Sequence, residues 1–129
     1  MIVLDTSATI EYLLERTHGP WVKERLTADP DVHCPHLIDV EVTNTLRSLV
    51  LRGTLTEADA LRALDEYSEF AVERYAHWPL LGRVWQLRAQ MTAYDAVYVA
   101  LAETIGATLV TADARLARAQ GHHARIVTP

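Results

Sequence analysis

The stretch Ile2-Val-Leu-Asp5-Thr-Ser7 decides the fold of this chain. Its apolar start contains two β-branched residues and ends abruptly at an acid, which is typical of a buried strand. The two hydroxyl residues that follow the acid are favoured at helix N-termini, so we predict that a helix begins there. A buried strand that leads directly into a helix indicates a parallel α/β sheet.

The rest of the chain repeats this alternation of short apolar strands and helices. We predict further strands at Val32–Cys34, Val72–Tyr75, Ala107–Thr111 and Arg125–Thr128. We predict further helices at Trp21–Leu26, Pro35–Leu51, Thr56–Phe70, Pro79–Arg88, Thr92–Ile105 and Ala114–Ala119. Unbroken apolar strands between helices favour a parallel sheet that is covered on both faces. In such sheets ligands bind beyond the carboxyl ends of the strands, where the strand order switches.

Length and composition indicate one globular domain spanning residues 1–129. Half of the 129 residues are hydrophobic, which argues against disorder. No apolar stretch approaches the length that spans a bilayer, and no signal-type segment opens the sequence, so we expect a cytoplasmic protein. The only cysteine, Cys34, excludes an internal disulfide and a cysteine zinc site, and we expect it in the core of a strand.

The charge balance limits how this protein can bind nucleic acid. Seventeen acidic and twelve basic residues give a net charge of −5. That charge argues against bulk electrostatic capture of a polyanion. It is compatible with a nuclease whose bound metal ions reverse the sign locally.

Four acids, Asp5, Glu41, Asp95 and Asp113, stand where strands end or helices begin. If Asp5 and Asp113 follow neighbouring strands, they face each other across the crevice. Two like charges about 5 Å apart repel by about 3 kcal/mol at an effective dielectric near 20, so an acidic cluster makes sense when it holds divalent cations.

Each acid also has a purely structural explanation. Asp5 and Asp113 can cap the helices that follow them, and Asp95 completes a capping pattern with Thr92. Glu41 can be a solvated helix residue. We expect the N-terminus of the helix that carries Asp95 to lie inside the protein, because a long Ala- and Val-rich segment follows it.

Other polar and aromatic residues receive weaker predictions. Asn44 lies three residues after Glu41, and we expect the two to share a helix face. Thr111 should point to the same side as Asp113 and hold a carboxylate or a water. We expect the six histidines on the surface or in loops and the three tryptophans in the core or at a dimer contact; these residues are His18, His33, His36, His77, His122, His123, Trp21, Trp78 and Trp85.

The chain resembles the PIN-domain family and, within it, the VapC toxins of bacterial toxin–antitoxin pairs. The resemblance extends over essentially the whole sequence. Four motifs carry it in the same order and spacing: Ile2-Val-Leu-Asp5-Thr-Ser7, Glu41-Val-Thr-Asn44, Thr92-Ala-Tyr-Asp95-Ala-Val-Tyr-Val-Ala-Leu-Ala102 and Thr111-Ala-Asp113.

The resemblance implies a Rossmann-like, three-layer α/β/α fold with a central parallel sheet in the strand order 3-2-1-4-5. It implies Mg²⁺ or Mn²⁺ held by the four acids, with Ser7, Asn44 and Thr111 supporting them. It also implies a toxin that is an endoribonuclease acting on transfer, ribosomal or messenger RNA, a homodimer, and inhibition by a cognate VapB antitoxin. The alternative is a catalytically silent PIN module that binds RNA or a protein.

Overall fold

The strands lie side by side in one parallel sheet. The computed structural model describes all 129 residues. The strands are β1 (Ile2–Leu4), β2 (Val32–Pro35), β3 (Glu73–Tyr75), β4 (Thr108–Val110) and β5 (Arg125–Val127). Their order is β3-β2-β1-β4-β5, which confirms the order that the resemblance implied.

The sheet order switches at β1, and this places the ends of β1 and β4 next to each other. Strand β1 pairs with β2 on one side and with β4 on the other, where Leu4 is in register with Val110. The residue after β1 continues this pairing, because the Asp5 amide donates to the Val110 carbonyl at 3.2 Å. The segments that follow β1 and β4 therefore leave the sheet from neighbouring positions.

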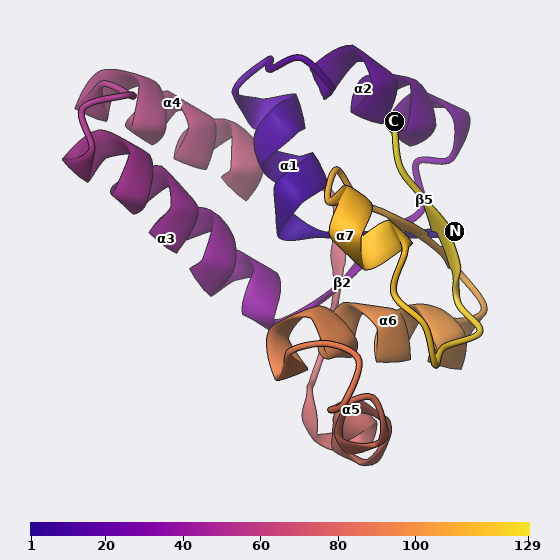
Figure 1. Cartoon of the computed structure of the whole chain (residues 1–129). Coiled ribbons are helices and arrows are strands. Elements are labelled where there is room, and N and C mark those ends of the chain that lie inside the picture. The colour runs from indigo at the N-terminus through magenta and orange to yellow at the C-terminus, as the bar shows by residue number, and fades with distance from the viewer.

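Helices cover both faces of the sheet. They are α1 (Thr6–Leu13), α2 (Gly19–Ala28), α3 (Leu37–Leu51), α4 (Glu57–Ser68), the 3₁₀ turn η1 (Trp78–Leu80), α5 (Leu81–Gln86), α6 (Ala93–Ile105) and α7 (Ala114–Ala117). In Figure 1, α1 and α2 lie above the sheet, α5 and α6 lie below it, and α3 and α4 form a hairpin that extends to the left. The predicted three-layer α/β/α fold is confirmed. None of the helices is both long and apolar enough to cross a membrane.

The core forms where β1 and β4 pack against α6. All residues of β1 are buried, and every residue of α6 from Ala96 to Ala102 is buried as well. The sequence predicted this deeply buried helix from its run of Ala and Val. Helix α6 ends at Gly106, whose φ of 68° lies in the left-handed region that glycine adopts without a steric penalty. Cys34 is a buried strand residue, as predicted.

Several helix starts differ from the prediction; α2, for example, begins at Gly19 instead of Trp21. Pro35 is the last residue of β2 and pairs with Tyr75, so α3 begins two residues later. The helix predicted from Pro79 begins as a 3₁₀ turn and ends at Gln86, short of Arg88. Asp5 itself caps α1, so the hydroxyl residues after it lie inside the helix and their side chains are free for other contacts.

The prediction of surface or loop positions for the histidines was wrong for His33. His33 is a buried residue of β2, and its Nδ1 lies 3.0 Å from the Tyr75 hydroxyl. This pairing with a neighbouring strand gives Nδ1 a partner, whereas Nε2 has no hydrogen bond and lies 3.0 Å from the Asp31 carboxylate. Trp78 and Trp85 are 82% and 68% exposed, so of the two alternatives predicted for the tryptophans only the dimer contact stays open for them. The short η1–α5 segment places both indoles on the outer face of the protein.

Candidate active site

A cleft of about 560 Å³ contains all four predicted acids in its lining. Asp5 and Asp113 come from the ends of β1 and β4, Glu41 from α3 and Asp95 from the first turn of α6. Acids up to 108 positions apart in sequence thus share one site, as predicted. The remaining lining residues are Thr6, Ser7, Ile10, Glu11, Arg16, Thr45, Tyr98 and Ala112.

Asp5 is both a helix cap and the most buried acid of the cleft, with 6% of its surface exposed. Its Oδ1 accepts hydrogen bonds from the Ala8 amide at 2.9 Å and the Ser7 hydroxyl at 2.8 Å. Its Oδ2 accepts one from the Thr111 hydroxyl at 2.5 Å. The structural explanation is therefore correct for this residue, and it does not exclude a functional role.

The environment of Asp5 disfavours its ionised form. Burial raises the pKa of this carboxyl to about 6, although three hydrogen bonds act in the opposite direction. The nearby charge of Asp113 raises the pKa further. No basic side chain forms an ion pair with Asp5 to offset this cost. A cation bound in the cleft would supply the missing positive charge.

Two hydroxyl groups join the ends of β1 and β4 around Asp5. The Ser7 and Thr111 hydroxyls lie 3.2 Å apart. The Ser7 hydroxyl accepts from the Ala112 amide and the Thr111 hydroxyl accepts from the Asp113 amide, both at 2.9 Å. The prediction that Thr111 contacts a neighbouring carboxylate is confirmed. Since every member of this network has a partner, the carboxylate is held in one orientation.

Glu41 is positioned by two residues that the sequence analysis missed. Its Oε2 accepts hydrogen bonds from the Thr6 and Tyr98 hydroxyls, each at 2.6 Å. Burial and the adjacent Glu41 raise the pKa of Tyr98, so the phenol stays protonated and donates. Tyr98 lies three residues after Asp95 on the same helix, a spacing from which its presence on the cleft side was predictable.

The structure does not bring Asn44 into the cleft. Its side chain is exposed and makes no hydrogen bond, whereas Thr45 lines the cleft. Helix geometry explains the difference, because the residue at i+4 lies about 40° from residue i around the axis and the residue at i+3 about 60° away on the other side. Thr45 is therefore the residue stacked on Glu41.

Asp95 lies nearer the surface than predicted. Its amide donates to the Thr92 hydroxyl at 3.2 Å, which confirms the helix cap. Its side chain is 31% exposed, and the two residues before it are exposed, so the expectation of a buried helix start was wrong. Only the middle of α6 packs against the sheet, and its first turn reaches past the strand ends.

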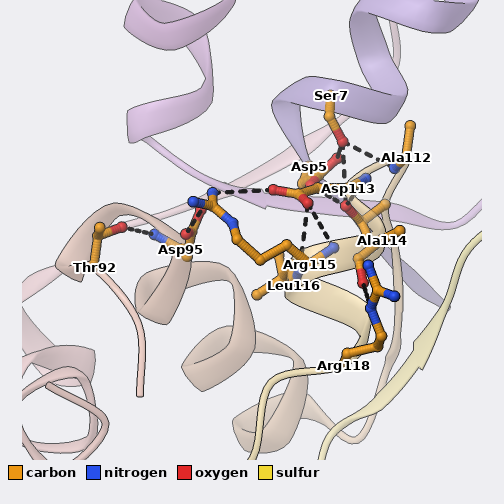
Figure 2. Close-up of polar contacts among 11 residues, drawn as sticks. Asp5, Ser7, Thr92, Asp95, Ala112, Asp113, Ala114, Arg115, Leu116 and Arg118 are labelled. Atoms are coloured by element: carbon orange, nitrogen blue, oxygen red, sulfur yellow. Dashed lines mark hydrogen bonds and ion pairs between the residues drawn. The ribbon is translucent and has the colours of Figure 1, made fainter. Parts of the chain in front are cut away.

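Arg115 stands between Asp95 and Asp113, as Figure 2 shows. Its guanidinium Nη2 lies 3.2 Å from the Asp113 Oδ2 and 3.9 Å from the Asp95 Oδ2. The Asp113 Oδ1 caps α7 by accepting from the amides of Arg115 at 2.8 Å and Leu116 at 3.4 Å. The position of Arg115 was not predictable, because nothing in the local sequence shows which acids a flexible side chain will reach.

The donor set of the cleft fits a hard divalent cation. Carboxylates and hydroxyls are the ligands that Mg²⁺ and Mn²⁺ prefer, and neither histidine nor cysteine lines the cleft. No three His, Cys, Asp or Glu side chains meet closely enough to form a ready-made metal site. Asp5, Glu41 and Asp113 instead accept hydrogen bonds from protein donors, and Asp95 lies 3.9 Å from the Arg115 guanidinium. The four acids could hold a cation once some of these side chains turn toward it.

Comparison with known proteins identifies related sequences over nearly the whole chain. The family described as PIN domain matches residues 2–121. Ribonuclease VapC9 of Mycobacterium tuberculosis is 45% identical over 116 residues, which cover 90% of this chain and 88% of that protein. Ribonuclease VapC12 of the same organism is 40% identical over 126 residues, which cover 98% of this chain and 97% of that protein.

Solved structures show the same fold. PAE2754 from Pyrobaculum aerophilum matches with a TM-score of 0.71 at 28% identity, covering 97% of this chain and 81% of that one. VapBC2 from Rickettsia felis, solved bound to a DNA fragment from its promoter, matches with a TM-score of 0.67 at 14% identity. That match covers 99% of this chain and 98% of the other. At this low identity the second likeness concerns the fold alone.

Proposed function

This chain belongs to the PIN-domain family and to its VapC type, and we propose that it is a divalent-cation-dependent endoribonuclease that acts as the toxin of a toxin–antitoxin pair. The relatives named VapC ribonucleases support the ribonuclease and toxin roles. One structural observation supports the proposal that the activity depends on a cation. Four carboxylates from distant parts of the chain line one cleft at the point where the strand order switches.

The four acids would hold Mg²⁺ or Mn²⁺, which when bound would lower the pKa of a water molecule and neutralise charge on the scissile phosphodiester. The hydroxyls of Ser7 and Thr111 fix the orientation of Asp5. Those of Thr6 and Tyr98 do the same for the carboxylate on α3. This pre-orientation reduces the rearrangement that substrate and cation binding require.

The charge of the cleft supports a role for the cation in RNA binding as well. Its lining contains five acids and one arginine, Arg16. An RNA phosphate that approached these acids without a counter-charge would be repelled. We therefore expect RNA to bind in the cleft only when a divalent cation is present. Transfer, ribosomal and messenger RNA share this phosphate chemistry and remain candidate substrates.

The proposal includes a VapB-type antitoxin as the partner of this chain. The VapBC2 structure from Rickettsia felis supports it, because that structure has the same fold. Association of the purified chain with the product of a neighbouring gene, measured by co-purification, is the direct test.

The proposal also includes a homodimer. Trp78, Leu81, Trp85 and Tyr94 expose between 45% and 82% of their surface. Exposed aromatic and aliphatic groups of this size are typical of an interaction surface. We expect light scattering to show a dimer, and we expect Trp85→Ser to shift the population toward monomer. A wild-type monomer at tens of micromolar would contradict the homodimer.

The alternative function is a silent module that binds RNA or a protein without cutting. The engagement of three of the four carboxylates by hydrogen-bond donors of the protein, with no ready-made metal site, favours it. It predicts RNA binding that does not depend on the acids of the cleft.

Cleavage of a structured RNA by the purified chain, free of any antitoxin, distinguishes the two functions. We expect cleavage with Mg²⁺ or Mn²⁺, no cleavage in EDTA, and at least about a 100-fold loss in Asp5→Asn. The matched control is Asp65→Asn, because Asp65 is an exposed acid of α4 outside the cleft, and it should cut normally. Absence of cleavage, with equal RNA binding by wild type and Asp5→Asn, would establish the binding module instead.

A further inference from the structure

We propose that Arg115 is a counter-ion built into the cleft, which a divalent cation must displace from Asp95 and Asp113. The residue therefore sets the concentration of metal at which the site fills. This inference rests on the proposed function, because it concerns the same carboxylates.

The role of Arg115 is inferred from the ion pairs that it forms with acids of the cleft. Of the four acids, Asp95 and Asp113 form ion pairs, and both pair with the same nitrogen of Arg115. The guanidinium makes no other hydrogen bond. Figure 2 shows the arginine side chain reaching across between the two carboxylates. A positive group thus already occupies the space between two of the acids that would hold a cation.

The way Arg115 is attached allows its side chain to leave. Its backbone amide is fixed by the hydrogen bond to Asp113 that caps α7. Its side chain is 80% exposed, so the guanidinium loses little packing when it moves. Exposed ion pairs are also weak, which makes replacement by a doubly charged ion favourable. The backbone would stay in place while the guanidinium swings out.

The other arginines near the cleft do not have this arrangement. Arg16 lines the cleft but forms no ion pair with any acid. Arg118, the residue directly after this short helix, donates its Nε–H to the Ala114 carbonyl at 3.0 Å and pairs with no acid. These two residues carry the same charge at similar places, so they are matched controls for Arg115.

The proposal predicts a gain in metal affinity when the competitor is removed. Without Arg115, nothing offsets the repulsion between the two carboxylates, and Mn²⁺ binds without displacing a cation. We expect Arg115→Gln to bind Mn²⁺ about threefold to tenfold more tightly than wild type, a range set by the weakness of exposed pairs. Arg16→Gln and Arg118→Gln should stay within about twofold of wild type, since neither guanidinium pairs with an acid that Mn²⁺ would have to release.

The experiment is calorimetric titration of EDTA-treated wild-type protein and the three glutamine variants with Mn²⁺ alone. Thermal melting of each metal-free variant shows that it is folded. The same order of metal affinities should appear in the Mn²⁺ concentration that gives half-maximal cleavage.

Three results would overturn the inference, and they differ in what else they overturn. If wild-type protein binds Mn²⁺ as tightly as Arg115→Gln, the competition between Arg115 and the cation is refuted, and the metal dependence is not. An equal gain in Arg118→Gln would refute it too, because the effect would then be general charge. Wild-type protein and Arg115→Gln that both fail to bind Mn²⁺ would refute the metal dependence itself.

Discussion

Replacing Asp5 by Asn should stabilise the metal-free protein, and the gain should grow with pH. The pKa of Asp5 is raised from 3.8 to about 6, chiefly by burial. At 1.36 kcal/mol for each pKa unit, this rise corresponds to about 3 kcal/mol. The energy is the cost of keeping the carboxylate ionised in the folded state.

The direction of this pH dependence follows from the number of protons that the folded and unfolded states bind. Because the pKa is higher in the folded state, the folded protein binds more protons than the unfolded chain between about pH 4 and pH 6. The contribution of Asp5 to stability therefore falls as the pH rises through this window, and the full penalty applies above about pH 6. Asn cannot ionise, so the variant lacks the penalty.

The asparagine side chain fits the contacts of the carboxylate. Its oxygen can accept from the Ala8 amide and the Ser7 hydroxyl, and asparagine caps helices about as well as aspartate. Its amide can donate to the Thr111 hydroxyl, which can rotate and donate to Ser7 instead. No buried polar group is left without a partner.

The assay is urea unfolding of wild type and Asp5→Asn in EDTA from pH 4 to pH 8. We expect the free energy of unfolding of the variant to gain about 2–3 kcal/mol on wild type over this range, with most of the change below pH 6.5. A difference that stays constant with pH would refute the reasoning, since it would show that the folded-state pKa is not raised. A difference that shrinks with rising pH would show that the carboxylate is stabilised rather than strained.

Three further predictions concern the supports of the cleft and of the fold. Tyr98→Phe removes a 2.6 Å hydrogen bond to Glu41, so we expect the free energy of unfolding in urea to fall by about 1 kcal/mol and calorimetry to show weaker Mn²⁺ binding. Unchanged Mn²⁺ affinity would contradict the role of Tyr98 in positioning Glu41. Asp95→Ala should leave the melting temperature in EDTA within about 2 °C of wild type while losing the rise on adding Mg²⁺, whereas a large drop in EDTA would show a mainly structural residue. Arg83→Ala removes two hydrogen bonds, at 2.7 and 3.0 Å, to the Glu103 carboxylate, whose side chain is only 5% exposed. We expect denaturant unfolding to show a free energy of unfolding lower by about 2 kcal/mol with normal RNA cleavage, and a change in cleavage would link this pair to the site.

The elements of the fold were largely predictable because their signals are local. The apolar run before Asp5 and the Ala- and Val-rich segment of α6 gave a strand and a buried helix directly. Asp5, Asp95 and Asp113 were predictable because they stand at strand ends and helix starts, whereas Glu41 was predicted from the family resemblance, since a solvated helix position explained it locally. Errors arose where tertiary contacts override local preference, as when Pro35 pairs with Tyr75 and extends β2.

The supporting contacts of the site were less predictable. The pairs of Thr6 with Glu41 and of Thr111 with Asp5 join residues 35 and 106 positions apart, and they depend on how strands and helices pack. No periodicity in the sequence encodes such a contact. The bound cation, the homodimer and the cytoplasmic location stay predictions.

The capping role of Asp5 and Asp113 has a consequence for the design of catalytically inactive variants. Exchange to alanine removes the oxygen that receives the first amides of α1 or α7, so a loss of toxicity in growing cells would mix lost chemistry with lost protein. Asparagine separates the two effects, since it keeps that oxygen and abolishes the negative charge. A harmless asparagine variant present at normal abundance would then report on chemistry alone.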